Sequence, residues 1–168
     1  YGLLDEIVPE AKLLDRGEAL QELAKRYFIS HGPATVYDFS WWSGLTVSEA
    51  KKAVDSNASL FEAITIGDFR YWCKKGLLDA IDHSENVTML LPAFDELLIS
   101  YKDRSAMVAD AHRKQVYTNN GIFRPVIVLD NQIIGIWKSI KAKGRVAIEK
   151  LCFDSSNKDT NPALKAAM

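Results

Sequence analysis

Residues 16–74 decide the fold of this chain, and they read RGEALQELAKRYFISHGPATVYDFSWWSGLTVSEAKKAVDSNASLFEAITIGDFRYWCK. The stretch begins with apolar side chains three and four positions apart over residues 17–31, the spacing of one helix face. Gly32 and Pro33 end this helix, because glycine can adopt the left-handed capping conformation and proline cannot donate a hydrogen bond into a continuing helix. The predicted inner face of the helix contains Ala19, Leu20, Leu23, Ala24, Tyr27 and Phe28.

Two further helices follow, and each begins with a side chain that can cap its first turn. Thr35 is placed to accept a backbone N–H, and Asp38 lies in the first turn, where the helix dipole favours a carboxylate. Thr46 and Glu49 have the spacing of a capping box, in which each side chain binds the other residue's backbone N–H. Gly44 precedes this box, so the sequence predicts two helices joined by a tight turn.

A predicted β-hairpin completes the stretch. Residues 60–66 and 69–73 contain β-branched and aromatic strand formers, and Gly67 and Asp68 lie where a hairpin turn is needed. Three helices followed by a hairpin are the element order of a winged helix, whose third helix enters the DNA major groove. The predicted DNA contacts of this part of the chain are Ser48, Lys51, Lys52 and Arg70.

A second interpretation of the same elements stays open. Lys51 and Lys52 are offset by Glu49 and Asp55, so the charge of the outer face nearly cancels, whereas attraction to phosphate normally supplies non-specific DNA affinity. Winged helices also serve as protein-interaction modules or scaffolds without DNA contact. Such a module is expected to have an apolar outer face on its third helix and binding that is insensitive to salt.

The composition is that of an ordinary globular protein. The 168 residues have a formal net charge of −1, which argues against a strongly basic nucleic-acid binder and leaves DNA contact to local patches. Cys73 and Cys152 lack the spacing of a zinc site or a redox pair, so we expect buried thiols, no metal and no other cofactor. No apolar run is long enough to span a bilayer, and the first residues lack a signal-peptide pattern, so we expect a cytoplasmic protein without membrane contact.

The second half of the chain is richer in predicted strands. Pro92 ends the first of them, Gly121 supplies a positive φ in a turn, and Gly135 marks a bulge or a point of close packing. A hairpin turn is expected at residues 130–132. The predicted strands are residues 87–91, 126–129, 133–137 and 145–153.

The densest run of basic residues connects the last two of these strands. Residues 138–145 read KSIKAKGR, without an opposing acid, and the tip of a hairpin can reach the DNA backbone or enter a groove. An equally open interpretation is a solvated turn whose lysines protect a sheet edge from aggregation. A predicted short basic helix extends the patch if the fold brings the two together. The candidate phosphate contacts are Lys138, Lys141, Lys143 and Arg145, with Arg113 and Lys114 on the short helix.

Two groups of charged residues lie between these segments. Lys102 and Arg104 flank Asp103, which favours a structural salt bridge, and Arg104 suits either that bridge or a phosphate clamp, so it is a further candidate DNA contact. Asp95 and Glu96 are neighbours and do not face each other on a helix, which argues against a general acid–base pair. Asp95 fits a cap or a turn better.

Several motifs, in a fixed order along most of the chain, resemble those of one bacterial family. The family is the winged-helix DNA-binding family that includes the alkylpurine and interstrand-crosslink-repair DNA glycosylases. The matching stretches are GPAT at residues 32–35, DF at 38–39, WSGL at 42–45, LLPAFDELLISYKDR at 90–104, HRKQVY at 112–117 and the hairpin GIFRPVIVLDNQIIGIWK at 121–138.

The resemblance implies tandem winged-helix units and a strand-rich C-terminal part, acting on duplex DNA. In characterised members, a polar pair in the N-terminal region, glutamine with glutamine or with aspartate, cleaves the base–sugar bond. Gln21, Gln115 and Gln132 do not reproduce that motif, so no catalytic residue is assigned. The chain is therefore expected to be the C-terminal half of such a protein, packed against an N-terminal domain, or a relative without the catalytic half.

We predict an α+β fold, with a winged helix followed by a strand-rich unit. The predicted function is binding of double-stranded DNA within a repair-glycosylase-like protein, whose intact form would flip a damaged base and cleave its glycosidic bond. The alternative is a winged-helix protein-interaction or scaffold module. The expected segments are a connecting segment at 1–15, a winged-helix domain at 16–75, a strand-rich unit with short helices at 76–153, and a polar linker with a truncated helix at 154–168.

Overall fold

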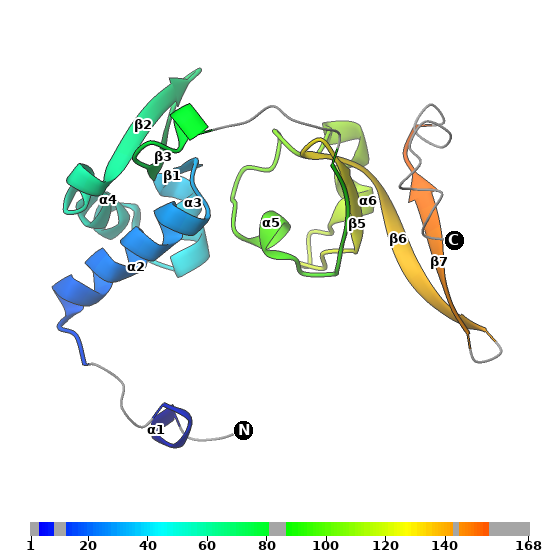
Figure 1. The fold of residues 1–168 in the computed structure, drawn as a ribbon, viewed down its shortest axis with the longest axis horizontal. Coiled ribbons are helices and arrows are strands. Elements are labelled where there is room, and N and C mark those ends of the chain that lie inside the picture. Colours follow the sequence, from blue (N-terminus) through cyan, green and yellow to red (C-terminus); the bar gives the residue numbers. More distant parts are fainter. Residues whose placement is uncertain (1–3, 9–12, 81–86, 143–144, 155–168) are drawn as a thin grey trace. The chain divides into compact units, whose positions relative to one another are not determined.

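The computed structural model describes residues 4–8, 13–80, 87–142 and 145–154, and the chain divides into two compact units. The first unit is Tyr1–Ala80 and the second is Ile81–Met168. Each unit combines helices with an antiparallel sheet (Figure 1), so the predicted mixture of α and β structure is confirmed. Within the described ranges, no helix is both long and apolar enough to cross a bilayer. The same ranges contain no cluster of three or more His, Cys, Asp or Glu side chains that could hold a metal ion.

Helices and a three-stranded sheet form the first unit. Its elements are α1 (Leu4–Ile7), α2 (Arg16–Ser30), β1 (Ala34–Thr35), α3 (Val36–Ser43), α4 (Val47–Asp55), β2 (Phe61–Ile66) and β3 (Phe69–Lys74), with 3₁₀ turns at Ala58–Leu60 and Leu78–Ala80. The strand order is β1-β3-β2, and neighbouring strands are antiparallel. Gly67, at a φ of 58°, and Asp68 form the turn between β2 and β3, where the sequence predicted it.

Each of the three longer helices in this unit begins at a capping box. Asp15 caps α2, Thr35 caps α3 and Thr46 caps α4, and in each case the residue three positions later binds back to the cap. Thr35 and Thr46 are the caps expected from the sequence. Because a capping box satisfies two otherwise unpaired N–H groups, each helix start is determined by residues close to it in the chain.

Gly32 is required for a different reason from the one that the sequence suggested. The cap residue of α2 is His31 in a right-handed conformation, and Gly32 does not adopt the left-handed φ that we expected. A Cβ atom at Gly32 would lie 2.5 Å from the carbonyl oxygen of Phe28 and 2.7 Å from Cα of Cys73. The close approach of α2 to β3 therefore needs a residue without a side chain.

Aromatic side chains form much of the core of the first unit. Tyr27 and Phe28 of α2 are buried, and the Phe28 ring lies 5.5 Å from that of Phe39 in α3 and 5.4 Å from that of Phe61 in β2. Large rings in such contacts contribute both buried apolar area and specific geometry. The inner face of α4 is also buried, through Ala50, Ala53 and Val54.

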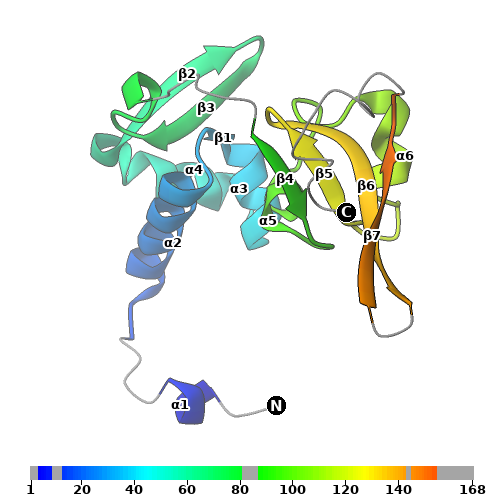
Figure 2. The same cartoon turned by 45° about the vertical axis from the view of Figure 1, so that its right-hand side comes forward.

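The second unit contains a four-stranded antiparallel sheet in the order β4-β5-β6-β7. Its elements are β4 (Thr88–Leu91), α5 (Glu96–Ile99), a 3₁₀ turn at Asp110–His112, α6 (Arg113–Val116), β5 (Val126–Leu129), β6 (Gln132–Ala142) and β7 (Arg145–Cys152). β5 pairs with the first part of β6 only, up to Ile136, whereas β7 pairs with β6 as far as Ala142. The outer part of β6 and β7 is therefore a two-stranded ribbon, visible in Figure 2.

This ribbon corrects the prediction for residues 138–145. We expected a strand that ends at Trp137 and a loop of basic residues after it, but β6 continues to Ala142 and β7 begins at Arg145. The physical reason is that β7 supplies backbone hydrogen-bond partners along this whole length, whatever the charge of the side chains. The tip that we expected for this hairpin includes residues 143–144, which lie outside the described residues.

Two local features set the register of β6. Asp130 and Asn131 form the turn after β5 with φ values of 48° and 63°, the double positive φ that suits the twist of a two-residue hairpin. A bulge interrupts the pairing after Ile127, and a Cβ atom at Gly135, opposite it, would lie 2.5 Å from the carbonyl oxygen of Leu151. Gly135 is thus both beside a bulge and a point of close packing, as predicted.

The short helices and the sheet share the core of the second unit. Leu98 of α5 and Val116 of α6 are fully buried with Val126 and Val128 of β5. Asp95 accepts the backbone N–H of Leu97 and caps α5, the role expected for it.

The two cysteines differ in burial. Both are free thiols. Cys73 is buried, and this burial raises the pKa of its thiol, whereas Cys152 is half-buried. The expectation of burial is therefore confirmed for Cys73 alone.

Candidate nucleic-acid interface

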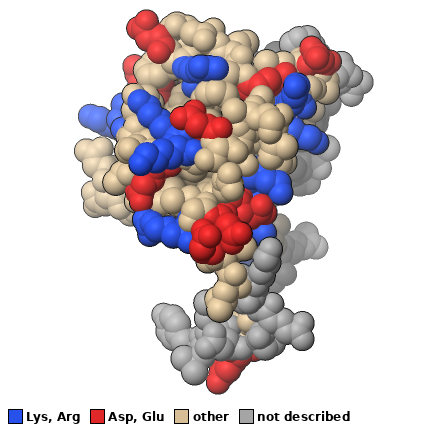
Figure 3. All heavy atoms as spheres, turned by 90° about the vertical axis from the view of Figure 1, so that its left-hand side faces the viewer, with Lys and Arg blue, Asp and Glu red and all other residues tan. Residues whose placement is uncertain are grey.

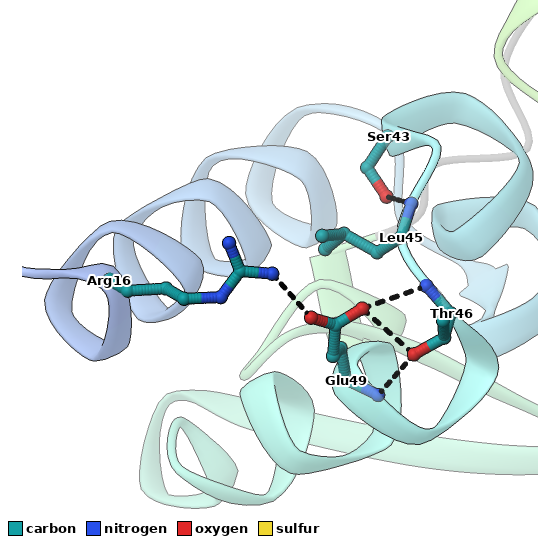
Figure 4. Close-up of polar contacts among 5 residues, drawn as sticks. All are labelled: Arg16, Ser43, Leu45, Thr46 and Glu49. Carbon is teal, nitrogen blue, oxygen red and sulfur yellow. Dashed lines mark hydrogen bonds and ion pairs between the residues drawn. The ribbon is translucent and has the colours of Figure 1, made fainter.

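Helix α4 is held in place by its own cap and by an ion pair to α2. Arg16 Nη2 lies 2.6 Å from Glu49 Oε1, while Glu49 Oε2 accepts the backbone N–H and the hydroxyl of Thr46 (Figure 4). These contacts, the Arg16 hydrogen bond foremost, lower the pKa of Glu49 to about 2. In the preceding turn, Ser43 Oγ accepts the N–H of Leu45. The first turn of α4 is therefore tied both to α2 and to its own start.

The outer face of α4 is polar. Ser48, Lys51 and Lys52 are exposed, as the sequence predicted, and Asp55 is exposed at the end of the helix. Glu49 is engaged by Arg16, so this carboxylate offsets the two lysines less than its sequence position suggested. On the face drawn in Figure 3, Lys and Arg side chains alternate with Asp and Glu side chains. Positive charge is therefore local there and does not form one continuous patch.

A hollow of about 330 Å³ lies between α4 and the β2–β3 hairpin. Lys51 and Asp55 of α4, Arg70 and Trp72 of β3, and Tyr37 at the start of α3 are among the residues that line it. The guanidinium carbon of Arg70 lies 4.2 Å from the centroid of the Trp72 ring, a cation–π contact that orients the charge. Lys51 and Arg70, which the sequence suggested separately, therefore line the same hollow.

Arg104 is used inside the second unit. Its side chain is buried, and it donates hydrogen bonds to the carbonyl oxygens of Leu98 and Lys102. Its guanidinium carbon lies 5.1 Å from the ring centroids of both Tyr117 and Phe123. These contacts brace the loop after α5, and the burial of Arg104 does not favour the phosphate clamp considered from the sequence.

Asp103, beside Arg104, is also engaged locally. Its side chain accepts the backbone N–H of Ser105 at 2.9 Å, a bond that lowers the pKa of this carboxyl. Both charged residues therefore stabilise the loop in which they lie.

Arg113 and Lys114 are exposed on α6, next to a row of aromatic rings. The guanidinium carbon of Arg113 lies 5.7 Å from the Tyr117 ring, and Tyr117 stacks on Phe123 with 5.5 Å between centroids. Phe123 in turn meets Phe94 edge to face at 6.1 Å. Three rings in a row thus connect an exposed cation on α6 to the loop before α5.

Lys138 and Lys141 extend from the β6–β7 ribbon. Lys138 Nζ lies 3.0 Å from Glu149 Oε2 on the neighbouring strand, so the run does have an opposing acid, contrary to the sequence-based expectation. Because side chains alternate along a strand, Lys138 and Lys141 lie on opposite faces of the ribbon. Arg145 is the first residue of β7, and Lys143 lies outside the described residues.

The sequence did not single out three residues that shape these surfaces. Arg16 and Glu149 each meet their partner only through the fold, and paired opposite charges far apart in a sequence carry no local signal. Phe94 adopts a φ of 58° with an exposed ring. Positive φ values are usually predicted from glycine or asparagine, and neither residue is next to Phe94 in the sequence. Pairing the two predicted strands in their antiparallel register would have found Glu149, since it lies directly opposite Lys138.

Comparison with known proteins identifies the family of the chain. Residues 1–168 match the family described as DNA glycosylase AlkZ-like. The chain is 25% identical over 138 residues to an interstrand DNA cross-link repair glycosylase of Streptomyces sahachiroi, a match that covers 77% of this chain and 36% of that protein. Its fold is similar to the solved structure of Streptomyces sahachiroi DNA glycosylase AlkZ, with a TM-score of 0.71, 20% identity, and coverage of 94% of this chain and 42% of that one. The chain therefore spans less than half the length of these two relatives. It belongs to the AlkZ-like DNA glycosylase family, the family that its ordered sequence motifs resemble.

Proposed function

We propose that this chain is a DNA-binding part of a DNA-repair glycosylase-like protein and that its first unit is a winged helix. The observation that carries the proposal is the element order α2, β1, α3, α4, β2, β3 with the sheet order β1-β3-β2, in a member of a DNA glycosylase family. In such an arrangement α3 and α4 form the helix-turn-helix, and the β2–β3 hairpin is the wing.

The first unit contacts DNA through α4 and the wing in this proposal. Ser48, Lys51 and Lys52 are exposed on α4, and Arg70 lies across the hollow from Lys51. Cations of this kind contact phosphates and position a protein on the duplex, whereas base edges supply sequence preference. We therefore assign Lys51, Lys52 and Arg70 to backbone contact and Ser48 to the groove-facing side of α4.

The second unit contributes the β6–β7 ribbon. Lys138 and Lys141 lie on opposite faces of it, and a ribbon in a DNA groove has a phosphate backbone on each side. We include Lys143 and Arg145 because they flank Gly144 in the sequence between β6 and β7, and Arg113 and Lys114 because they are exposed on α6. Arg104 is left out, since it is buried.

The proposed ligand is double-stranded DNA, and binding needs no metal or other cofactor. We propose that the intact protein flips a damaged base and cleaves its glycosidic bond with residues outside this chain, in an N-terminal domain that packs with it in the cytoplasm. Support for this division comes from the length of the match, which covers 36% of the cross-link repair glycosylase.

A winged-helix protein-interaction module is the second candidate. Ile64, Ile66 and Phe69 on the hairpin are exposed apolar side chains, which favours a protein partner for that surface. The polar outer face of α4 favours DNA instead. Because DNA binding through phosphates weakens with salt and apolar contact does not, salt dependence separates the two.

The test is titration of a labelled duplex by the 168-residue chain across a salt series, measured by filter binding. Wild type is compared with Lys51→Gln/Lys52→Gln and with Lys138→Gln/Lys141→Gln. The matched control is Lys25→Gln/Arg26→Gln, two cations of α2 that pair with Glu22. Each phosphate contact removed should lower the slope of log affinity against log salt by about 1. The slope should therefore fall by about 2 in each test variant and should not change in the control.

The two candidates give opposite results in this titration. Absence of wild-type binding at low salt, or binding that salt does not weaken, would contradict the DNA proposal. Equal slopes for wild type and both test variants would show that DNA binds elsewhere on the chain.

A further inference from the structure

We infer that Phe94 is a stacking contact for a nucleobase of DNA bound by the second unit. The inference rests on the proposed DNA-binding function and names one residue and its chemistry within it. It is carried by the backbone conformation of Phe94, the exposure of its ring, the rigid support behind that ring and the exposed cations that neighbour its supporting rings, Tyr117 and Phe123.

Phe94 has a backbone conformation that a bulky L-residue rarely adopts. Its φ is 58°, in the left-handed region, within the loop between β4 and α5. Pro92 restricts the chain on one side, and Asp95 fixes it on the other by capping α5. Strained residues of this kind persist where the surrounding structure determines them, and they are common in ligand clamps.

The strain does not place the ring in the core. Phe94 is 55% exposed, although the fully buried Leu98 lies on the next helix. The described ring contact of Phe94 is the edge-to-face contact with Phe123, which leaves much of the ring surface available to solvent. An exposed aromatic face is the surface on which an unstacked base binds, with little dependence on its identity.

The support behind Phe94 is rigid. Phe123 is half-buried and stacks on Tyr117, and the buried guanidinium of Arg104 lies 5.1 Å from both rings. Arg104 is itself fixed by its hydrogen bonds to the backbone at Leu98 and Lys102. The exposed ring is therefore held at the end of a braced row, as a stacking platform requires.

The charges around this row match a nucleotide. Arg113, Lys114 and Arg124 are exposed, and none of the ion pairs among the described residues involves them. The acids that follow Phe94 are engaged within the fold, because Asp95 caps α5 and Glu96 accepts the hydroxyl of Ser100. A ring face for a base and cations for its phosphates thus occur together. An apolar protein segment would use the ring and leave the cations without a role.

The experiment compares two labelled duplexes of equal length, one fully paired and one with a single mismatch, whose bases leave the stack more easily. The full chain is titrated as wild type, Phe94→Ala, Phe94→Tyr and Ile122→Ala, the last a control at another exposed apolar residue of the same unit. Phe94→Ala should weaken binding to the mismatched duplex about tenfold, the order expected for loss of one base–aromatic stack. Phe94→Tyr and Ile122→Ala should bind like wild type.

The salt dependence gives an independent readout. Phe94→Ala should keep the wild-type slope, because a ring contacts no phosphate, whereas Arg113→Gln should lower the slope by about 1. A loss of slope in Phe94→Ala would mean that the substitution disturbs the cations, and it would overturn the stacking role.

The remaining outcomes separate this inference from the proposed function. If wild type binds and Phe94→Ala binds both duplexes equally well, the inference fails and the proposed function stands. If wild type binds neither duplex, both fail.

Phe94→Gly removes the strain together with the ring, so it should unfold no earlier than wild type while binding the mismatched duplex weakly. Earlier unfolding of this variant would show that the contact of the ring with Phe123 stabilises the fold by more than the strain costs, which accounts for the conformation of Phe94 without a ligand and would overturn the inference.

Discussion

At the scale of single residues, Glu49 gives stability a dependence on pH. Its pKa is lowered from 4.5 to about 2 in the folded state, so between these values the unfolded chain binds more protons than the folded one. The contribution of Glu49 to the free energy of unfolding is therefore complete when the pH is above the ordinary pKa of this carboxyl. It is lost as the pH falls toward the folded-state pKa of about 2. We expect Glu49→Gln to unfold at a lower urea concentration than wild type at neutral pH, and to unfold like wild type near the lower value.

The measurement is urea unfolding followed by far-ultraviolet circular dichroism across that pH range. Ser48→Ala, at an exposed position on the same helix, is the control and should follow wild type throughout. A difference between Glu49→Gln and wild type that stays constant with pH would mean that the Arg16–Glu49 contact does not act through charge.

Gly32 gives a second prediction at this scale. A Cβ atom there would meet backbone atoms of α2 and β3, which cannot move aside as a flexible side chain can. We expect Gly32→Ala to lower the free energy of unfolding by about 3 kcal/mol, the upper end for overpacking of a close contact. Gly44→Ala is the matched comparison, because Gly44 has a φ of 72° but open space around it. It should cost about 1–2 kcal/mol, from backbone conformation alone. Equal losses in the two variants would contradict the packing role of Gly32.

How well the sequence predicted these residues depended on the distance between partners. Thr46 and Glu49 are three positions apart, and their capping box was predictable because helix geometry brings them together in any fold. Arg16, which completes the site, was not predictable because α2 and α4 must first pack. Gly32 was recognised as important for the wrong reason, since its neighbour Cys73 belongs to a strand formed much later in the chain.

At the scale of elements, the β6–β7 ribbon combines a proposed DNA contact with an acid. Glu149 pairs with Lys138, and both side chains are more than half exposed, at 55% and 66%. An exposed pair of this kind adds little to stability, about 0–1 kcal/mol. The acid does, however, place negative charge where DNA phosphates would come. We expect Glu149→Gln to leave unfolding unchanged and to strengthen duplex binding at low salt.

The check is a filter-binding titration of Glu149→Gln beside wild type, with Glu22→Gln of α2 as a control that removes the same charge elsewhere. The gain in affinity should disappear at high salt, since it is electrostatic. Unchanged or weaker binding by Glu149→Gln at low salt would place the ribbon away from the DNA.

The elements themselves were predicted unevenly. Strand β4 and the turn at Gly67 and Asp68 follow from local patterns, an apolar run before Pro92 and a turn pair between strand formers. The length of β6 did not follow from a local pattern. Lys138, Ser139 and Lys141 have the sequence character of a polar loop and become a strand only through pairing with β7. The left-handed φ of Phe94 was equally hidden, since it is imposed by both ends of its loop.

At the scale of the whole molecule, the first unit contains a core of its own. Tyr27, Phe28, Phe39 and Phe61, which line that core, all belong to residues 1–80 and contact one another there. We expect residues 1–80, expressed alone, to unfold in one cooperative transition on urea addition, followed by circular dichroism. Phe28→Ala in the same fragment, a large-to-small change in a fully buried site, should cost about 3–5 kcal/mol and abolish the transition in a marginal fragment. A gradual change in the wild-type fragment would show that the unit needs the rest of the chain.

The family was predictable at this scale although much of the geometry was not. Ordered motifs such as GPAT at residues 32–35 and LLPAFDELLISYKDR at residues 90–104 can be read from the sequence, and in this chain they supply the Thr35 cap of α3 and the Asp95 cap of α5. Surface arrangements such as the hollow beside Lys51 and Arg70 depend on how three separate elements meet, which no single motif encodes.

Trp137 lets the second unit be followed by intrinsic tryptophan fluorescence. Its Nε1–H donates to the carbonyl oxygen of Leu91 at 2.8 Å, so the ring is fixed between the end of β4 and the start of the ribbon. The other three tryptophans of the chain, Trp41, Trp42 and Trp72, all belong to the first unit. The fluorescence lost in a Trp137→Phe variant is therefore that of the second unit alone. The wavelength of its emission maximum reports whether the ribbon is packed against β4, and no dye needs to be attached.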